Sequence, residues 1–331
     1  MKGGGWGRRT LIAIPYAWLL VLFLAPFLIV LRISLSDFAI SQPPYAPVLD
    51  LPACFGDAAA EGAEGAEAAE GAEAPDLLAC IGGWADQVWG LVENWDFDNY
   101  IWLTQDNIYW LSYITSVEIA ALSTLAILLI GYPIAYGMAR APKAWQPTLL
   151  MLVILPFWTS FLIRVYAWIS ILKPEGLLNQ FLQGIGLIDE PLVILGTNTA
   201  VYIGIVYSYL PFMVLPLYAT LAKMDESLLE AAQDLGCTRF AAFWLVTIPL
   251  SIPGIIAGSM LVFIPAVGEF VVPDLLGGSE TLMIGRTLWT EFFGNRDWPV
   301  ASAVAIILLL VLVVPIVLFQ RHQDRAQEAG R

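Results

Sequence analysis

Six long apolar stretches, separated by short polar segments, dominate the chain. They cover residues 10–33, 113–139, 148–172, 198–222, 246–270 and 299–320. A bilayer core about 30 Å thick requires ~20 mostly apolar residues for a helical span, so each stretch is long enough to cross a membrane. Backbone groups in lipid must bond internally, and the alternating strands of a barrel are absent from the sequence. The pattern predicts an all-α polytopic membrane protein with six transmembrane helices.

Composition agrees with this interpretation and excludes an ordinary soluble domain. Hydrophobic residues make up 59% of the chain and charged residues 13%, whereas globular domains average about 45–50% and about 25%. The first apolar stretch follows basic residues, as a secretory signal would. It is longer than a signal core, however, and no small-x-small cleavage site follows it. We therefore expect a retained first transmembrane helix.

Lysine and arginine indicate the orientation. Six spans place both termini on one side, and most of the fifteen basic residues fall on that side. By the positive-inside rule, this side is cytoplasmic. The expected cytoplasmic segments are residues 1–9, 140–147, 223–245 and 321–331. The expected periplasmic loops are residues 34–112, 173–197 and 271–298.

The net charge of −14 is concentrated in the first outer loop. An acidic low-complexity insert occupies about 54–80, and its centre at 61–73 reads EGAEGAEAAEGAE. Like charges at every third position and repeated glycines disfavour a helix, so a solvated tether is expected. The tether could concentrate a cationic solute, but charge screening favours simple filler. Cys54 and Cys80 bracket the insert and could form a disulfide in an oxidising periplasm, or remain two free thiols.

The polar segment between the fourth and fifth apolar stretches predicts a helical elbow. Asp225 can cap a helix N-terminus, and Ser227 with Glu230 forms an alternative capping box. Gly236 suits the left-handed position that ends a helix, and Thr238 can cap a second short helix. An apolar stripe is expected on the first helix at Leu228, Leu229, Ala232 and Leu235.

Small side chains on this elbow would let another protein approach closely, and a glutamate there offers a charge to a basic partner. The residues that form the motif are Glu230-Ala231-Ala232, Gly236 and Val246-x-Ile248-Pro249. They resemble the EAA signature of bacterial ABC importer permeases. The resemblance implies that Glu230, Ala231, Ala232 and Gly236 belong to a coupling helix that docks on an ATPase subunit. The alternative is an amphipathic linker with a chance motif.

The resemblance extends over nearly all of the chain outside residues 46–98. Segments 154–166, 263–270 and 295–299 are similar to the polyamine permeases of this family. The resemblance implies a type I importer permease of the bacterial inner membrane, working with a second homologous permease, an ATPase dimer and a periplasmic substrate-binding protein. The implied solute is a polyamine, with putrescine expected first and spermidine next.

A diamine needs carboxylates or carbonyls for its ammonium groups and aromatic faces for cation–π contact. The candidates for this pathway are Glu269, Asp274, Trp158, Tyr166 and Tyr207. Alternatively, the two carboxylates cap the turn at Pro273, and the aromatic rings only pack or anchor the helices. Arg164 would repel a cation, so we expect it to pair with a carboxylate or with backbone carbonyls.

Several classes of chemistry are not expected. No GxxxxGK[ST] loop occurs, so ATP and Mg²⁺ should bind a separate ATPase. His322 is the only histidine, and we expect no metal site, cofactor, enzymatic activity or nucleic-acid partner for this chain. The alternatives are an importer of the same architecture for thiamine or ferric iron, an ion-coupled secondary transporter, and a membrane scaffold that transports nothing.

Overall fold

The computed structural model describes residues 5–46, 48 and 95–329. The chain divides into two compact units. Unit 1 combines Met1–Asp106 with Thr290–Arg331, and unit 2 is Asn107–Trp289. Cys54, Cys80 and the acidic insert lie outside the described residues.

Unit 1 contains the first and last long helices of the chain. Helix α1 (Gly5–Ser34) packs along α15 (Trp298–Ala329). Strands β1 (Asp37–Phe38) and β2 (Tyr45–Ala46) form a small antiparallel pair, an exception to the all-α expectation. Helix α4 (Asp98–Gln105) and the π-helical turn η3 (Thr290–Asn295) complete the described part of the unit.

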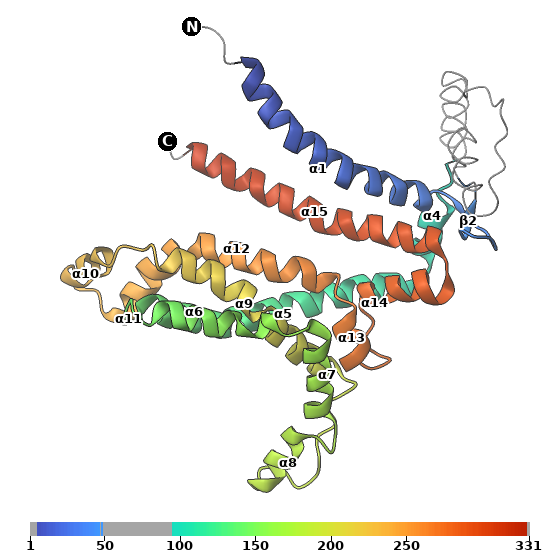
Figure 1. Ribbon diagram of the computed structural model, residues 1–331. Coiled ribbons are helices and arrows are strands. Elements are labelled where there is room, and N and C mark those ends of the chain that lie inside the picture. Colours follow the sequence, from blue (N-terminus) through green and yellow to red (C-terminus); the bar gives the residue numbers. More distant parts are fainter. Residues whose placement is uncertain (1–4, 47, 49–94, 330–331) are drawn as a thin grey trace, which may run out of the picture. The chain divides into compact units, whose positions relative to one another are not determined.

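Unit 2 is a helical bundle built on three long helices. Helices α5 (Asn107–Arg140), α9 (Asn198–Leu221) and α12 (Ile248–Val267) lie side by side (Figure 1). Their interfaces combine apolar side chains with small polar ones, such as Ser116, Ser208 and Ser251, which are buried in the bundle. The fully buried centre of the bundle includes Ile127, Met213, Val214, Leu217 and Val262.

Two glycines of α12 allow its backbone to approach α9 closely. A Cβ at Gly258 would lie 2.7 Å from the Met213 sulfur and 3.1 Å from the Met213 carbonyl oxygen. A Cβ at Gly254 would lie 2.6 Å from Thr220 Oγ1 and 2.9 Å from Thr220 Cβ. The two glycines are four residues apart, the small-xxx-small spacing that brings membrane helices together.

The remaining helices of unit 2 are shorter. In chain order they are α6 (Gln146–Ile154), the 3₁₀ turn η1 (Leu155–Trp158), α7 (Phe161–Leu172), α8 (Leu177–Gly184), α10 (Ser227–Asp234), α11 (Arg239–Ala242), the π-helical turn η2 (Phe243–Thr247), α13 (Val271–Leu276) and α14 (Ile284–Trp289). Helices α10 and α11 lie at one end of the bundle, whereas α7 and α8 leave it at a steep angle (Figure 1).

The predicted spans correspond to observed helices with two differences. Four helical stretches are long and apolar enough to cross a membrane: Ala13–Ser34, Asn107–Arg140, Asn198–Leu221 and Arg239–Val267. The span expected at 299–320 falls on α15, whose stretch Trp298–Val313 is a shorter apolar helix. The span expected at 148–172 is not one straight helix, because Gln146–Trp158 and Phe161–Gly184 meet at 87°.

The break has a local cause. Pro156 has no backbone N–H to continue the helical ladder, and the chain tightens into a 3₁₀ turn there. Thr159 then adopts an extended conformation, with φ −95° and ψ 149°, and its hydroxyl donates to the Pro156 carbonyl at 2.8 Å. If the bent pair is one span, the described residues contain five spans by length and composition.

Candidate functional site: the elbow and the opposite end of the bundle

Local hydrogen bonds define both ends of α10. The Asp225 carboxylate accepts from the Ser227 N–H at 3.0 Å, and this bond holds the pKa of the Asp225 carboxyl below its usual range. Gly236 has φ +89°, the left-handed conformation that glycine adopts at low cost. The Gly236 N–H donates to Gln233 O at 2.9 Å, and the Cys237 N–H donates to Ala232 O at 3.0 Å. These two bonds form a Schellman motif, as the glycine position predicts.

A second N-cap, at Thr238, begins the helical segment that leads from the elbow into α12. The Thr238 hydroxyl accepts from the Ala241 N–H at 3.2 Å and begins α11, as predicted. The chain then forms η2 before it continues as α12. A π-helical turn inside a longer helix is uncommon and is frequently found at functional sites. The side-chain oxygen of Thr247, the last residue of η2, is buried and has no hydrogen-bond partner among the described residues.

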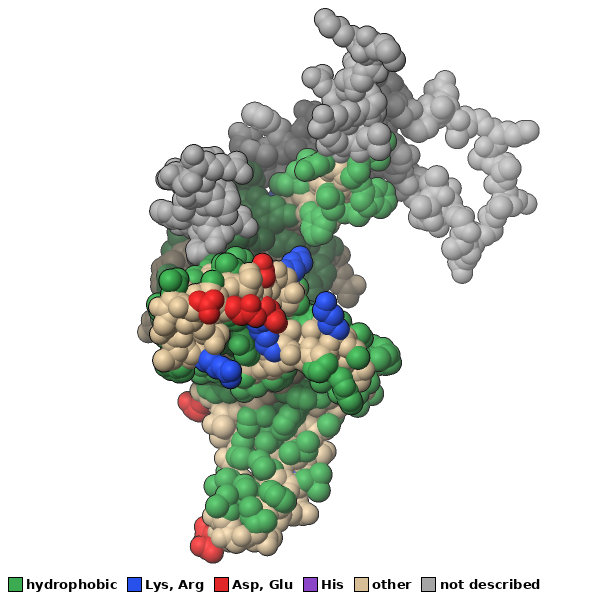
Figure 2. Space-filling view, turned by 90° about the vertical axis from the view of Figure 1, so that its left-hand side faces the viewer, with side chains coloured by type: hydrophobic (Ala, Val, Ile, Leu, Met, Phe, Trp, Pro, Cys, Tyr) green, Lys and Arg blue, Asp and Glu red, His purple; other side chains and the backbone are tan. Residues whose placement is uncertain are grey.

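The outer surface of the elbow is open. Glu230, Ala231 and Gly236 are exposed, and Ala232 is half-buried. Leu235 is 88% exposed, so the predicted apolar stripe of α10 does not pack as a whole against the bundle. Figure 2 looks onto this end of unit 2, where acidic side chains gather with lysine and arginine beside them. The surface therefore combines small, apolar and acidic side chains without a covering segment among the described residues.

An ion pair links the elbow to α5. Arg140 Nη1 lies 2.5 Å from Glu226 Oε1, across 86 positions of sequence. Arg140 is the last residue of α5, and Glu226 immediately precedes α10. Sequence reasoning missed this pair, because neither residue belongs to the motif and only the fold brings them together.

Glu269 has a structural role at the opposite end of α12. Its side chain is buried, with 8% of the residue exposed. The carboxylate accepts from the Val271 N–H at 3.0 Å, from the Val272 N–H at 3.4 Å, and from the Tyr209 hydroxyl. It therefore caps the first turn of α13, which contains Pro273, as the alternative interpretation expected. Contact with a solute stays a prediction for this residue.

Asp274 lies on α13 and has a cationic neighbour. Its Oδ1 is 3.3 Å from Arg286 Nε, and Arg286 also donates to Gly278 O at 2.8 Å. The Asp274 side chain is about half exposed, so water and ions reach it as well. An incoming ammonium group would compete with Arg286 for this carboxylate.

The three candidate aromatic residues do not form one cage. Trp158 ends η1 and is 69% exposed, and Tyr166 lies on α7 and is also exposed. Tyr207 lies on α9, makes an edge contact with the Trp168 ring at 5.4 Å, and lines an apolar cavity of about 290 Å³. Their places on three different elements leave each role as a prediction.

The expected partner of Arg164 is not found. Its Nε and Nη1 atoms are buried and have no hydrogen-bond partner among the described residues, and the residue is 9% exposed. Its guanidinium lies over the Phe157 ring at 5.5 Å and over the Phe161 ring at 5.6 Å. Aromatic faces on both sides of the helix break thus replace the carboxylate or carbonyls that we expected. The cation–π attraction offsets part of the desolvation cost.

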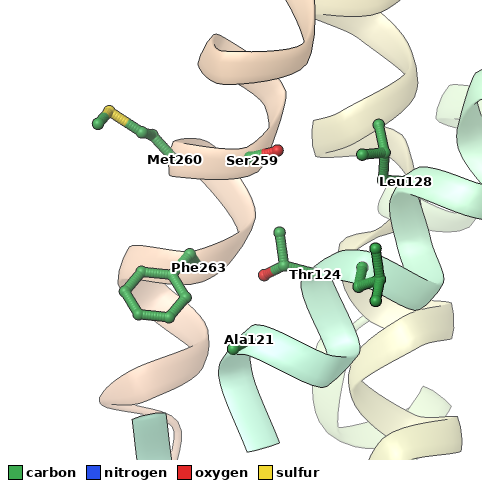
Figure 3. Close-up of a pocket in the computed structure, with 7 residues that line it drawn as sticks. Ala121, Thr124, Leu128, Ser259, Met260 and Phe263 are labelled. Carbon is green, nitrogen blue, oxygen red and sulfur yellow. The ribbon is translucent and has the colours of Figure 1, made fainter. Parts of the chain in front are cut away.

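A groove of about 370 Å³ lies between α5 and α12. Figure 3 shows Thr124 and Ala121 facing Ser259 and Phe263 across it. The Thr124 hydroxyl donates to the Ala120 carbonyl at 2.6 Å and is therefore already engaged. No lining residue is charged. The groove offers hydrocarbon contact and no counter-ion for an ammonium group.

The structure thus brings the four predicted ATPase-coupling residues together and separates the predicted substrate-pathway residues. Glu230, Ala231, Ala232 and Gly236 lie on one exposed elbow. The pathway candidates are distributed between α13, α7, α9, η1 and the end of α12. No group of three or more potential metal ligands occurs in the part of the chain that the structure describes.

Known proteins resemble the chain in sequence and in fold. The family described as the binding-protein-dependent transport system inner membrane component matches residues 127–328. The spermidine/putrescine transport system permease protein PotB of Escherichia coli (strain K12) is 45% identical over 224 residues, covering 68% of this chain and 81% of that protein. PotB of Haemophilus influenzae is 46% identical over 206 residues, covering 62% and 72%.

A solved structure supports the fold. A bacterial ABC transporter involved in the import of the acidic polysaccharide alginate contains a chain with a TM-score of 0.57 and 20% identity. The similarity covers 76% of this chain and 96% of that one. At this identity, the likeness concerns the fold alone.

The family match covers more than half of the sequence, and the PotB relatives confirm the polyamine-permease resemblance. The chain belongs to the family of inner membrane components of binding-protein-dependent transport systems, the permeases of ABC importers.

Proposed function

We propose that this permease carries a polyamine, putrescine or spermidine, from a periplasmic binding protein into the cytoplasm. The observation that carries the proposal is the 45% identity to a spermidine/putrescine permease over 81% of that protein. The molybdenum transport system permease protein ModB of Mycobacterium bovis is 30% identical over 206 residues, a lower identity than that to PotB. Putrescine is the first expectation and spermidine the second.

The elbow would transmit the work of ATP hydrolysis. We place Glu230, Ala231, Ala232 and Gly236 against a partner ATPase, since the outer surface of α10 is exposed and rich in small side chains. The assembly would contain this permease, a homologous second permease, two ATPase subunits and the binding protein. The elbow and both termini would face the cytoplasm, in accordance with the distribution of lysine and arginine.

The solute would meet Glu269, Asp274 and the aromatic candidates on its way. Buried or interfacial carboxylates within a membrane protein are expensive to keep, and they are default candidates for a cation pathway. Selection would lie mainly in the binding protein, so the permease needs only moderate affinity for the diammonium form.

Uptake by the reconstituted complex tests the proposal. Liposomes containing both permeases, the ATPase and the binding protein should accumulate labelled putrescine or spermidine when ATP is supplied. Thiamine and ferric iron are the comparison solutes. Uptake of either in place of the polyamines would contradict the substrate assignment. Uptake by this chain alone, without nucleotide, would indicate an ion-coupled secondary transporter.

One substitution tests the elbow. Glu230→Ala should weaken ATPase binding and reduce ATP-dependent uptake by about tenfold, the effect of losing roughly 1.4 kcal/mol of charged contact. Glu175→Ala is the matched control, because Glu175 is exposed and precedes α8 on a loop expected outside. If the ATPase binds equally well to wild type and Glu230→Ala, the elbow is not its docking site. A complex whose ATP hydrolysis never responds to solute would indicate a scaffold.

A further inference from the structure

The elbow has a non-covalent connection to α5 in addition to its covalent connections. Residues 222–226 join α10 to α9, and α11 with η2 joins it to α12. Helix α5 is not joined to the elbow by a short connecting segment, because α6 to α9 lie between them in the sequence. The Arg140–Glu226 ion pair, at 2.5 Å, supplies a direct link between the elbow and the end of α5.

The two ends of this pair differ in exposure. The Arg140 side chain is 22% exposed, and its guanidinium lies 5.6 Å from the centre of the Tyr136 ring on the same helix. Its Nη2 atom is buried without a hydrogen-bond partner among the described residues. Glu226 is 71% exposed on the elbow. The cation is therefore held on α5, while the carboxylate belongs to the segment that we expect to move.

Aromatic contacts hold η2 against the same part of α5. The Phe243 ring makes edge contacts with Tyr136 at 5.6 Å and with Tyr132 at 5.8 Å. The Tyr132 hydroxyl is 2.9 Å from Ser251 Oγ on α12. Arg140 and Phe243 thus both contact Tyr136, so the ion pair and the π-helical turn are attached to one turn of α5.

We propose that Arg140 and Glu226 are positioning residues for energy coupling, which pass displacement of the elbow directly to α5. This inference rests on the proposed function, in which α10 docks on the ATPase. A surface ion pair contributes little to stability, so its loss should leave the fold and the docking surface intact. Its loss should instead reduce how far α5 follows the elbow, because the charged link is removed while the Phe243 contacts remain, so that ATP is hydrolysed with less transport.

Charge reversal in the full complex tests the inference. The variants are Glu226→Arg, Arg140→Glu and the double swap, with Glu226→Gln as a milder change. Lys143→Glu is the matched control, because Lys143 is exposed, three residues beyond Arg140, and has no ion pair among the described residues. Three quantities are measured on each preparation: ATPase retained by the purified permeases, ATP hydrolysed, and polyamine transported per ATP.

We expect each single reversal to lower transport per ATP about fivefold or more, the lower end of typical coupling between sites. Retained ATPase should stay unchanged, and the double swap should restore transport per ATP. Normal transport per ATP in the single variants would overturn the inference. So would loss of ATPase binding, an unrescued double swap, or an equal effect of Lys143→Glu.

The Glu230→Ala variant, measured in parallel, separates the two proposals. If it releases the ATPase while the ion-pair variants transport normally, only the role of Arg140 and Glu226 is wrong. If it retains the ATPase, the proposed docking site is wrong, and the coupling inference is overturned with it.

Discussion

Because α12 approaches α9 closely at two glycines, alanine substitutions there should lower the stability of the bundle. Gly254→Ala would place a methyl group 2.9 Å from Thr220 Cβ and 3.1 Å from the Pro216 carbonyl oxygen. Thr220 is β-branched and stiff at χ1, and its hydroxyl already donates to Pro216 O at 3.0 Å. The new methyl can fit only if α9 shifts or this hydrogen bond breaks.

The magnitude follows from three contributions. Overpacking of a well-packed interface costs about 1–3 kcal/mol. Loss of the Thr220 hydrogen bond costs about 1 kcal/mol. Replacing glycine by alanine inside a helix gains ~0.5–1 kcal/mol. Gly254→Ala should therefore destabilise the bundle by about 1–3.5 kcal/mol. Gly258→Ala should cost less, because part of its obstacle is the flexible Met213 side chain.

Gly137→Ala is the matched control. Gly137 also lies inside a long helix, α5, but a Cβ there meets no atom within 4 Å. It should be neutral or slightly stabilising, since only the helix propensity changes. Thermal unfolding of the purified chain in detergent, followed by tryptophan fluorescence, should rank the transition temperatures as Gly137→Ala, Gly258→Ala, Gly254→Ala, from high to low. A Gly254→Ala protein as stable as Gly137→Ala would refute the packing argument.

Three further substitutions test individual side chains. Arg164→Met should leave the transition temperature unchanged or raise it, because it removes a guanidinium whose buried Nε and Nη1 atoms have no hydrogen-bond partner in the described part of the chain; a large fall would mean that a partner was missed. Glu269→Ala should cost roughly 0.5–2 kcal/mol as a lost cap, while Glu269→Gln should keep the fold and lower polyamine uptake; normal uptake by the glutamine variant would remove Glu269 from the pathway. The Ser227 N–H lowers the pKa of Asp225, so the cap is complete above the unfolded pKa of about 3.9 and is lost as pH falls through the folded value. Asp225→Asn should abolish this acid dependence of amide-exchange protection in α10, and protection that still falls with acid would contradict the assignment.

Much of the fold could be predicted from local patterns. Apolar stretches anticipated α9 almost residue for residue, with 198–222 expected and Asn198–Leu221 observed. Gly236 and Thr238 also fulfilled their predicted roles, because a left-handed glycine and a capping hydroxyl act on neighbours within a few residues. The small sheet and the short helices α8, α13 and α14 had no comparable signal in the apolar pattern.

The remaining features depend on tertiary contacts. Composition cannot separate one straight span from two helices meeting at 87°, since both bury the same apolar residues. The sequence is compatible with Glu269 as a solute ligand or as a cap, and only the position of the α13 amides gives it the capping role. The Arg140–Glu226 pair spans 86 positions, so no short motif could indicate it.

The packing of α1 against α15 has a consequence for biogenesis. Roughly 260 residues separate the two helices, and a ribosome adds about 5–20 residues per second. Synthesis of α15 therefore begins about 13–50 s after synthesis of α1 ends. During that interval lipid is its main solvent. Among the described residues, no part of its most apolar 18-residue window is buried, and the mean hydropathy of that window is 2.4. Helix α1 is thus suited to insert into the membrane by itself, and α15 packs against it only after the rest of the chain has been synthesised.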